Sequence, residues 1–365
     1  PIADMMIPQR ALLFGWALLF PSLFLLHRAA IKKDTSAFVP LAVLAGTLPL
    51  IHTHSFLALG IISGFYFIRS LLKNEGKAQW IGYAKYLGIV LLLAAPQLIF
   101  FTFKQSGSFL KFHFNWANES DNYFWFYIKN FGLIAILAPV AFIAAKKEDR
   151  GVVGGALLIW LIAELIQFQP NPYDNNKLLF IAFAYACGLV SGWLFDAKDR
   201  LASGSLSNRY SIALLSAVVC VTMFLSGALT LGREYVSEYQ LIDRDQLSAA
   251  EYVEDNTAPN ATFLTYNNHN NCIAALTGRN IVCGSGSYLF FHGVDYSARE
   301  NALPLLYEQP ETYFDQLAKQ YNIDYVFIGS SERANYSIDL DYFAEHFSVF
   351  YQNDGVIIYD VHSQS

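Results

Sequence analysis

Two histidines, His52 and His54, follow directly after the apolar stretch that ends at Ile51. Near neutral pH an imidazole can donate or accept a hydrogen bond, bind a metal or transfer a proton. Histidines at positions i and i+2 can ligate one metal only from an extended or turn backbone, because they diverge on a helix. The pair therefore has two interpretations. The histidines cap short helices at the membrane interface, or they contact a ligand, for which a substrate is favoured over a metal.

A second polar group, Asp174, Asn175 and Lys177, stands between two apolar stretches, and Glu164 lies about one turn inside the first of them. Ionisable groups at membrane depth are costly and usually face a cavity or a partner. The simplest interpretation is a local ion pair between Lys177 and either Asp174 or Glu164. The functional alternative is a hydrogen-bonding cluster for a sugar or phosphate, with Lys177 supplying positive charge. Asp174 and Glu164 are also residue types that form acid–base pairs.

Aromatic and polar side chains gather in three further segments. Residues 109–127 are dense in Phe, Trp and Tyr, which favours a belt at the lipid headgroups; a platform for a lipid carrier or sugar is the alternative. Asn and His cluster at 267–271, and a polar cluster runs from His292 to Arg299. Loops of this kind serve as binding sites and as ordinary turns. The sequence indicates no cofactor and no paired Cys/His spacing for zinc, and leaves a divalent cation open.

Eight apolar stretches must position these groups. A helical crossing of a bilayer needs roughly 17–25 mostly apolar residues, and each stretch reaches or approaches that length, 37–51 least well. The stretches cover residues 11–27, 37–51, 55–72, 87–103, 123–145, 151–168, 178–195 and 211–231.

Lysine and arginine are concentrated in every second gap between these stretches. Positive loops stay in the cytoplasm, so the pattern predicts that Pro1 and everything after Leu231 lie outside. The basic gaps contain Arg28, Lys32, Lys33, Lys73, Lys77, Lys85, Lys146, Lys147, Arg150, Lys198, Arg200 and Arg209, whereas the other gaps contain only Lys104, Lys111 and Lys177.

An external first residue needs an upstream segment to carry it across the membrane. No signal-peptide pattern precedes Arg10. We therefore expect a fragment that lacks an N-terminal part with an odd number of spans.

Composition divides the chain into two parts. Apolar residues make up 54% and aromatic residues 16%, which is high for a soluble protein. Residues 1–232 carry 18 basic and 11 acidic side chains, and residues 233–365 carry 6 and 19. An acidic external domain argues against nucleic acid as a partner. The sequence thus predicts an α-helical polytopic membrane bundle at 1–232 and a small extracytoplasmic α/β domain at 233–365.

Strand and helix patterns alternate between about residues 246 and 361. Pro310 is typical of a helix start, and Asn353-Asp354-Gly355 is a good hairpin turn. The alternation predicts a mainly parallel sheet with an antiparallel edge. Expected strands are 261–266, 280–283, 324–329, 348–351 and 356–361, with helices at 246–255 and 310–321 and a helical turn at 272–276.

Four segments resemble poorly characterised bacterial and archaeal membrane glycosyltransferases of the GT-C type. They are Pro8-Gln9-Arg10, Leu50-Ile-His-Thr-His-Ser-Phe56, Pro172-Tyr-Asp-Asn-Asn-Lys177, and Thr277-Gly-Arg279 together with His292-Gly-Val-Asp-Tyr296. The resemblance covers most of the chain. It implies an integral protein of a prokaryotic cell membrane that takes a sugar from a polyprenyl-phosphate donor and transfers it, outside the cytoplasm, to a glycan, lipid or protein.

The resemblance also implies where the substrate lies. The catalytic acid of the superfamily stands in the first external loop, which would precede Pro1, so no catalytic residue is assigned. His52, His54, Asp174, Asn175 and Lys177 are expected on the outer wall of the pocket, with Glu164 beside them. Lys177 or Arg10 would face the departing phosphate. The segment with His292 and Arg299 is a candidate roof.

Two other function classes stay open. A transporter usually shows inverted repeats and broken helices at the midplane, and no repeat is evident here. A non-catalytic assembly protein of the cell envelope would need only the external domain and an anchor, for which eight spans are excessive.

Overall fold

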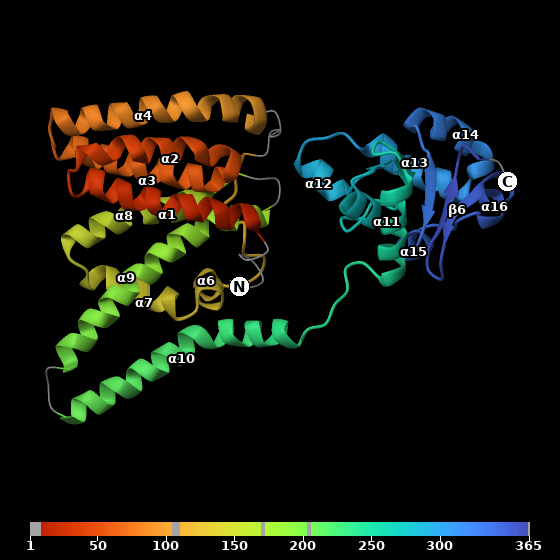
Figure 1. Cartoon of the computed structure of the whole chain (residues 1–365). Helices are drawn as coiled ribbons and strands as arrows, with labels where there is room; N and C mark the ends of the chain where they lie inside the picture. Colours follow the sequence, from red (N-terminus) through yellow and green to blue (C-terminus); the bar gives the residue numbers. More distant parts are fainter. Residues whose placement is uncertain (1–8, 104–109, 169–171, 203–205, 364–365) are drawn as a thin grey trace. The chain divides into compact units, whose positions relative to one another are not determined.

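The computed structural model describes residues 9–103, 110–168, 172–202 and 206–363. The chain divides into two compact units, Pro1–Ser237 and Glu238–Ser365 (Figure 1). The first is helical, and the second combines helices with a five-stranded sheet.

The helices of the first unit follow the predicted apolar stretches. They are α1 (Arg10–Ala30), α2 (Phe38–Ile51), α3 (Thr53–Leu72), α4 (Lys77–Gln97) with a π-helical turn (Leu98–Thr102), α6 (Tyr123–Phe131), α7 (Leu133–Ala144), α8 (Lys147–Leu165), α9 (Asn176–Ala202) and α10 (Leu206–Val236).

The expected count of eight spans is not confirmed. Within the described ranges, five helices are long and apolar enough to cross a membrane: α1, α3, α4 with its π-helical turn, α9 and α10. The stretch predicted at 123–145 is broken into α6 and α7, which meet at 101°. The break falls at Gly132, whose φ of 58° is strained for residues with a side chain. If this pair is one span the count is six; α2 has only 14 residues, and α8 begins with the charged run Lys147–Arg150.

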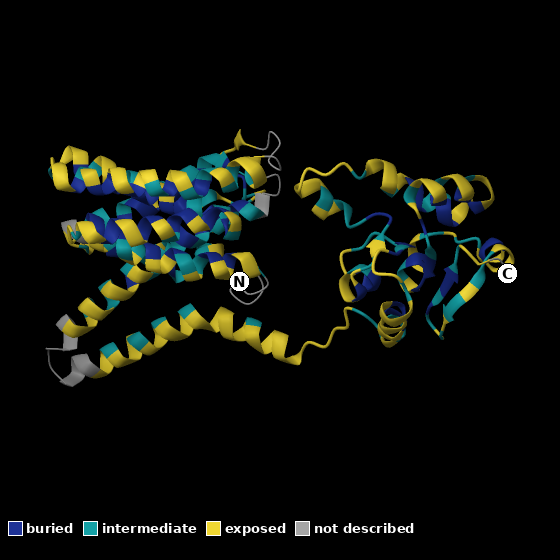
Figure 2. Ribbon diagram, turned by 45° about the horizontal axis from the view of Figure 1, so that its top comes forward, coloured by how far each residue is buried: buried dark blue, intermediate teal, exposed yellow. Residues whose placement is uncertain are grey.

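One apolar core joins α1, α2, α3, α4, α8 and α9. It contains Leu19, Phe38, Leu59, Tyr83 and Ile159. Outward-facing side chains are also apolar, and α10 is exposed along most of its length (Figure 2). Such extensive exposed apolar surface is unfavourable in water and fits a helical bundle surrounded by lipid.

The predicted basic loops meet at one end of the bundle. Lys33, after α1, forms an ion pair with Glu75, after α3. Gly151, at the start of α8, lies against the Arg69 guanidinium. The loops after α1 and α3 and the start of α8 therefore lie together, as the alternation predicts. The position of the basic gap between α9 and α10, and the side of the membrane that each end faces, stay predictions.

The second unit contains a mixed sheet in the order β4-β3-β5-β7-β6. β3 pairs in parallel with β4 and β5, whereas β7 pairs antiparallel with β5 and β6. The prediction was a mainly parallel sheet with an antiparallel edge. The neighbouring strands β4, β3 and β5 are parallel and the β7–β6 hairpin is the antiparallel edge, with two parallel and two antiparallel pairings in all, and the five strands lie where expected. Their bounds are β3 (Thr262–Leu264), β4 (Asn280–Ile281), β5 (Tyr325–Ile328), β6 (Ser348–Gln352) and β7 (Ile357–Asp360).

Helices cover both faces of this sheet because the strands are apolar on both sides. Phe327 points to a cluster with α11 (Arg244–Asn256) and the π-helical turn Ile273–Thr277. Its neighbours Val326 and Ile328 point to a cluster with α13, α14 and α16. The remaining helices are α12 (Gly286–Phe291), α13 (Ser297–Glu308), α14 (Pro310–Tyr321), α15 (Ser330–Asn335) and α16 (Leu340–His346).

Candidate functional site

His52 connects α2 to α3 and caps the start of α3. Its backbone is extended, with φ of −160°, so α2 ends at Ile51. Its Nδ1 accepts the Ser55 backbone N–H at 3.3 Å and lies 2.8 Å from the Ser55 hydroxyl. Because Nδ1 accepts that N–H, the neutral ring carries its proton on Nε2.

The short α2 places His52 below the end of the bundle. At 1.5 Å per residue, α2 is ~21 Å long and α1 is ~31 Å long. Gly15, in the second turn of α1, packs directly on the imidazole, since a Cβ added there would lie 2.8 Å from His52 Nδ1. His52 therefore lies roughly a turn and a half below the start of α1.

Both histidines present an unpaired nitrogen inside the bundle. His52 is 5% exposed and His54 8%, and their ring centroids are 5.3 Å apart. Nε2 of each ring is buried and has no hydrogen-bond partner. Buried polar atoms without partners cost free energy, so these nitrogens can gain by binding a polar ligand.

Asp174 and Lys177 form an ion pair at the start of α9. The Lys177 Nζ lies 2.7 Å from Asp174 Oδ1, and both side chains are only partly exposed. The simpler of the two interpretations, a local ion pair, is thus confirmed for Asp174, although a paired lysine can still act on a nearby ligand.

Asn175 holds the turn that precedes α9. It is fully buried, and its Nδ2 donates to the carbonyls of Ala163 and Ile166 at 3.0 and 2.9 Å. Its Oδ1 accepts the Phe168 N–H at 3.2 Å. These three bonds tie the turn to the end of α8, so Asn175 positions its neighbours rather than offering free polar atoms.

The histidine pair and the Asp174–Lys177 turn come together. The charges of Lys177 and Asp174 both act on the His52 ring, and that of Lys177 also acts on His54. Leu178, beside Lys177, packs in the same core as Leu48 near the end of α2. Positions more than a hundred residues apart in sequence therefore share one end of the bundle.

Glu164 has a different partner from the one expected. It is 4% exposed, and Oε2 accepts the phenolic hydroxyl of Tyr127 on α6, while Oε1 is buried without a hydrogen-bond partner. The predicted alternative of a Glu164–Lys177 pair is not among the described ion pairs. Nothing in the sequence indicated Tyr127, because 37 residues separate it from Glu164.

The aromatic segment folds back onto the same end of α8. β1 (Lys111–Phe112) pairs antiparallel with β2 (Ile166–Gln167), and Trp116 donates from Nε1 to the Ala163 carbonyl at 2.7 Å. The sequence predicted an interfacial belt here but not this pairing.

Arg10 is exposed in the first turn of α1. His292 and Arg299 belong to the second unit. His292 is exposed at the end of α12. Arg299 donates to the Val282 carbonyl at 2.9 Å and lies over the Tyr321 ring at 5.0 Å. These contacts are structural, and a role for either residue toward a ligand stays a prediction.

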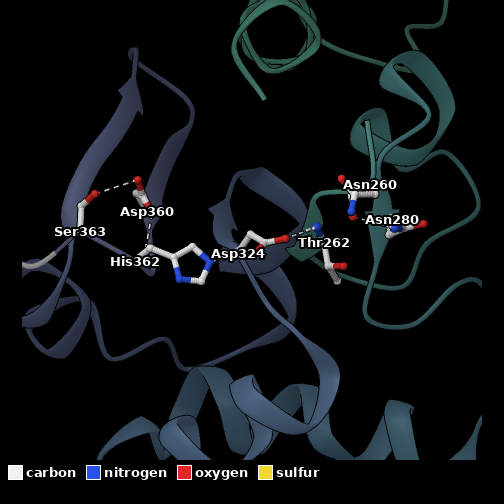
Figure 3. A network of polar contacts seen from close by, with 7 residues as sticks. All are labelled: Asn260, Thr262, Asn280, Asp324, Asp360, His362 and Ser363. Carbon is white, nitrogen blue, oxygen red and sulfur yellow. Dashed lines mark hydrogen bonds and ion pairs between the residues drawn. The ribbon is translucent and has the colours of Figure 1, made fainter. Parts of the chain in front are cut away.

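Polar groups also gather at the amino ends of β3 and β5 (Figure 3). Asp324 accepts the Thr262 N–H at 2.8 Å, and its other oxygen lies 2.8 Å from His362 Nε2. Asp360 accepts the His362 N–H and the Ser363 hydroxyl. The network joins the end of the chain to the sheet, which makes it structural.

Cys272 and Cys283 are free thiols buried in the second unit. Burial raises the pKa of the Cys272 thiol to about 12 and also raises the pKa of Cys283. In the part of the chain that the structure describes, no three His, Cys, Asp or Glu side chains are grouped as metal ligands would be.

No protein-family model matches the chain, and neither does any curated protein. Among solved structures, the chain is similar to the crystal structure of the oligosaccharyltransferase of Archaeoglobus fulgidus tethered with an acceptor peptide containing the NVT sequon. The TM-score is 0.43 and the identity 11%, over 95% of this chain and 49% of that one. The chain thus spans about half the length of that enzyme, and a similarity this low assigns no role to any residue.

Proposed function

We propose that this chain is part of a membrane glycosyltransferase that moves a sugar from a polyprenyl-phosphate donor to an extracytoplasmic acceptor. The observation that carries the proposal is the pair of buried, unpaired Nε2 atoms of His52 and His54 close to the charge of Lys177. Such a group inside an apolar bundle is costly unless it meets a polar ligand.

The chemistry of this group suits a phosphate. The His52 Nε2–H is a donor without an acceptor, and Lys177 adds positive charge in the first turn of α9. The starts of α3 and α9 both lie here, and helix N-termini favour anions. The apolar helices around them suit a polyprenyl chain.

In the proposed reaction an acceptor atom bonds to the anomeric carbon of the sugar while the bond from that carbon to the phosphate oxygen breaks. The carrier leaves as polyprenyl phosphate with the bonding electrons, and the acceptor gives up its proton to a base that stays unassigned. His52, His54 and Lys177 stabilise the negative charge on the leaving phosphate. Asn175 fixes the turn, and Asp174 orients Lys177. Arg10 and Glu164 are candidates for further substrate contacts in the first unit, and His292 and Arg299 are separate candidates in the second unit.

The test is donor turnover by the full-length protein, reconstituted in vesicles with a panel of polyprenyl-phosphate sugars. We expect the protein to release the carrier. Lys177→Ala should lower the rate at least tenfold, since removing one donor that stabilises developing negative charge typically lowers the rate by about 10²–10³. Lys129→Ala is the matched control, because Lys129 also forms an ion pair, with Asp121 on the loop before α6.

Two outcomes would overturn the proposal. One is movement of an intact solute across the vesicles without consumption of any donor, which would indicate a transporter. The other is an equal effect of Lys177→Ala and Lys129→Ala on turnover, which would remove Lys177 from the site.

A further inference from the structure

The carboxyl ends of β3, β4 and β5 meet at one edge of the second unit's sheet, and the chain leaves them toward opposite faces. After β3 it runs to the π-helical turn Ile273–Thr277, which packs in the α11 cluster. After β4 it runs to α12 and α13, which pack in the cluster on the other face. In α/β sheets, ligands bind at the carboxyl ends of strands where neighbouring connections diverge in this way.

Six side chains, the strand-end cluster, gather at this edge: Tyr266, Asn267, Asn268, His269, Tyr288 and Glu300. Asn267 Nδ2 donates to Glu300 Oε1 at 2.9 Å, and Asn268 Nδ2 lies 3.5 Å from the Ser331 hydroxyl. The Tyr288 ring stacks on His269 with centroids 4.2 Å apart and planes 15° apart. Loops that follow three different strands are thereby connected.

The cluster contains one unpaired polar atom and one partly exposed ring. Asn268 Oδ1 is buried and has no hydrogen-bond partner. A ligand hydroxyl would satisfy it and remove the free-energy cost of leaving it unpaired. Next to Asn268 in sequence, His269 supports the Tyr288 ring, which is 49% exposed.

The charges nearby disfavour an anionic ligand. Glu300 is the charged member of the cluster, and the segment 280–294 contains no charged residue. Arg299, the adjacent cation, is engaged with the Val282 carbonyl and the Tyr321 ring. The Glu300 carboxylate is already bonded to the Asn267 amide. The groups left to contact a ligand are therefore the Asn268 amide and the Tyr288 ring.

We propose that the strand-end cluster binds a neutral sugar residue. The exposed face of Tyr288 packs against the C–H face of the pyranose, and Asn268 Oδ1 accepts one of its hydroxyls. That the sugar belongs to the acceptor rests on the proposed transferase function, whereas the binding itself needs neither donor nor turnover.

The experiment measures binding of N,N′-diacetylchitobiose to the full-length protein in nanodiscs without donor, by saturation-transfer NMR and calorimetry. The de-acetylated, cationic disaccharide and digalacturonate are compared with it. We expect the neutral disaccharide to bind and the charged ones to bind more weakly, with little dependence on salt. Tyr288→Ala is expected to weaken binding about tenfold, the value of one aromatic contact, and Tyr288→Phe to retain most of it.

Matched controls lie elsewhere in the same unit. Tyr239→Ala removes an exposed tyrosine before α11, and His362→Ala removes an exposed histidine at the opposite edge of the sheet (Figure 3); both should bind normally, whereas His269→Ala should not. Three results would each overturn the proposal. The wild type binds no neutral sugar, Tyr288→Phe loses as much affinity as Tyr288→Ala, or the cationic disaccharide binds more tightly and with a dependence on salt. Donor turnover with no sugar binding would overturn it and leave the transferase proposal standing.

Discussion

Gly15 on α1 lies against the imidazole of His52, so closely that a Cβ would come within 2.8 Å of Nδ1. The Ser55 hydroxyl and backbone N–H contact the same ring at Nδ1. Gly15 and Ser55 thus both hold the Nδ1 edge of the His52 ring, which leaves Nε2 as the atom that is proposed to donate a hydrogen bond to the phosphate.

Gly15→Ala should therefore destabilise the bundle by about 1–3 kcal/mol through overpacking and reduce donor turnover by moving His52. Gly60→Ala is the control, because nothing lies within 4 Å of a Cβ at that position in α3. Thermal unfolding in detergent measures both, and equal melting temperatures for the two variants would contradict the close packing.

Asn175→Ala should destabilise the protein by about 1–3 kcal/mol, because the Ile166 carbonyl and the Phe168 N–H lose their bonds to the buried amide. The Ala163 carbonyl loses one donor and keeps Trp116 Nε1. Asn130→Ala removes one hydrogen bond from an exposed asparagine and should cost much less. Thermal unfolding of the two variants compares the losses, and an unaltered Asn175→Ala protein would show that the turn is held by other contacts.

The orientation of the bundle can be tested at Ser36 and Ser330, which are both exposed. Single cysteines at these positions, in a background without native cysteines, are treated with a membrane-impermeant thiol reagent on intact cells. Labelling at Ser330 and protection of Ser36 are expected from the positive loops. The reverse pattern would invert the topology and place the His52 end of the bundle in the cytoplasm.

Cys272 should resist alkylation in the folded protein. Burial raises its pKa to about 12, so the reactive thiolate is scarce near pH 8. The folded pKa lies above the unfolded one, so the stability contributed by the neutral thiol is complete below about pH 9 and is lost as pH rises toward 12. Iodoacetamide at pH 8, followed by peptide mass spectrometry with and without urea, should label Cys272 only after unfolding; rapid labelling without urea would contradict its burial.

Sequence patterns were sufficient to predict the helices of the bundle and all five strands, because apolar length and alternation are local signals. They were not sufficient for the ends and bends of helices. Gly132 stands in a stretch that was predicted as one span, 123–145, and its positive φ marks the break between α6 and α7. The pairing of β5 with β7 was also not predicted, since it joins segments about thirty residues apart.

For the candidate site, the sequence predicted which residues belong to it better than it predicted which groups they contact. The charge of Lys177 acts on both His52 and His54, and the outer wall that they were expected to share stays a prediction. The partners of Glu164 and Asn175 were not predictable, because Tyr127 lies on a distant helix and Asn175 bonds to backbone atoms. Every residue has a backbone carbonyl, so the sequence does not indicate which carbonyl a side chain will bond to.

The 101° bend at Gly132 has a consequence for how this protein responds to its bilayer. α7 has 12 residues and is too short to cross a bilayer alone. If it enters the membrane along the bilayer normal, α6 runs nearly parallel to the surface, with exposed Phe124 and Trp125 at the headgroups. The level of Tyr127, and with it the hydroxyl that meets Glu164, is then set by the thickness of the hydrocarbon layer. A change in lipid acyl-chain length would then shift Tyr127 relative to the buried Glu164 carboxylate and alter their hydrogen bond.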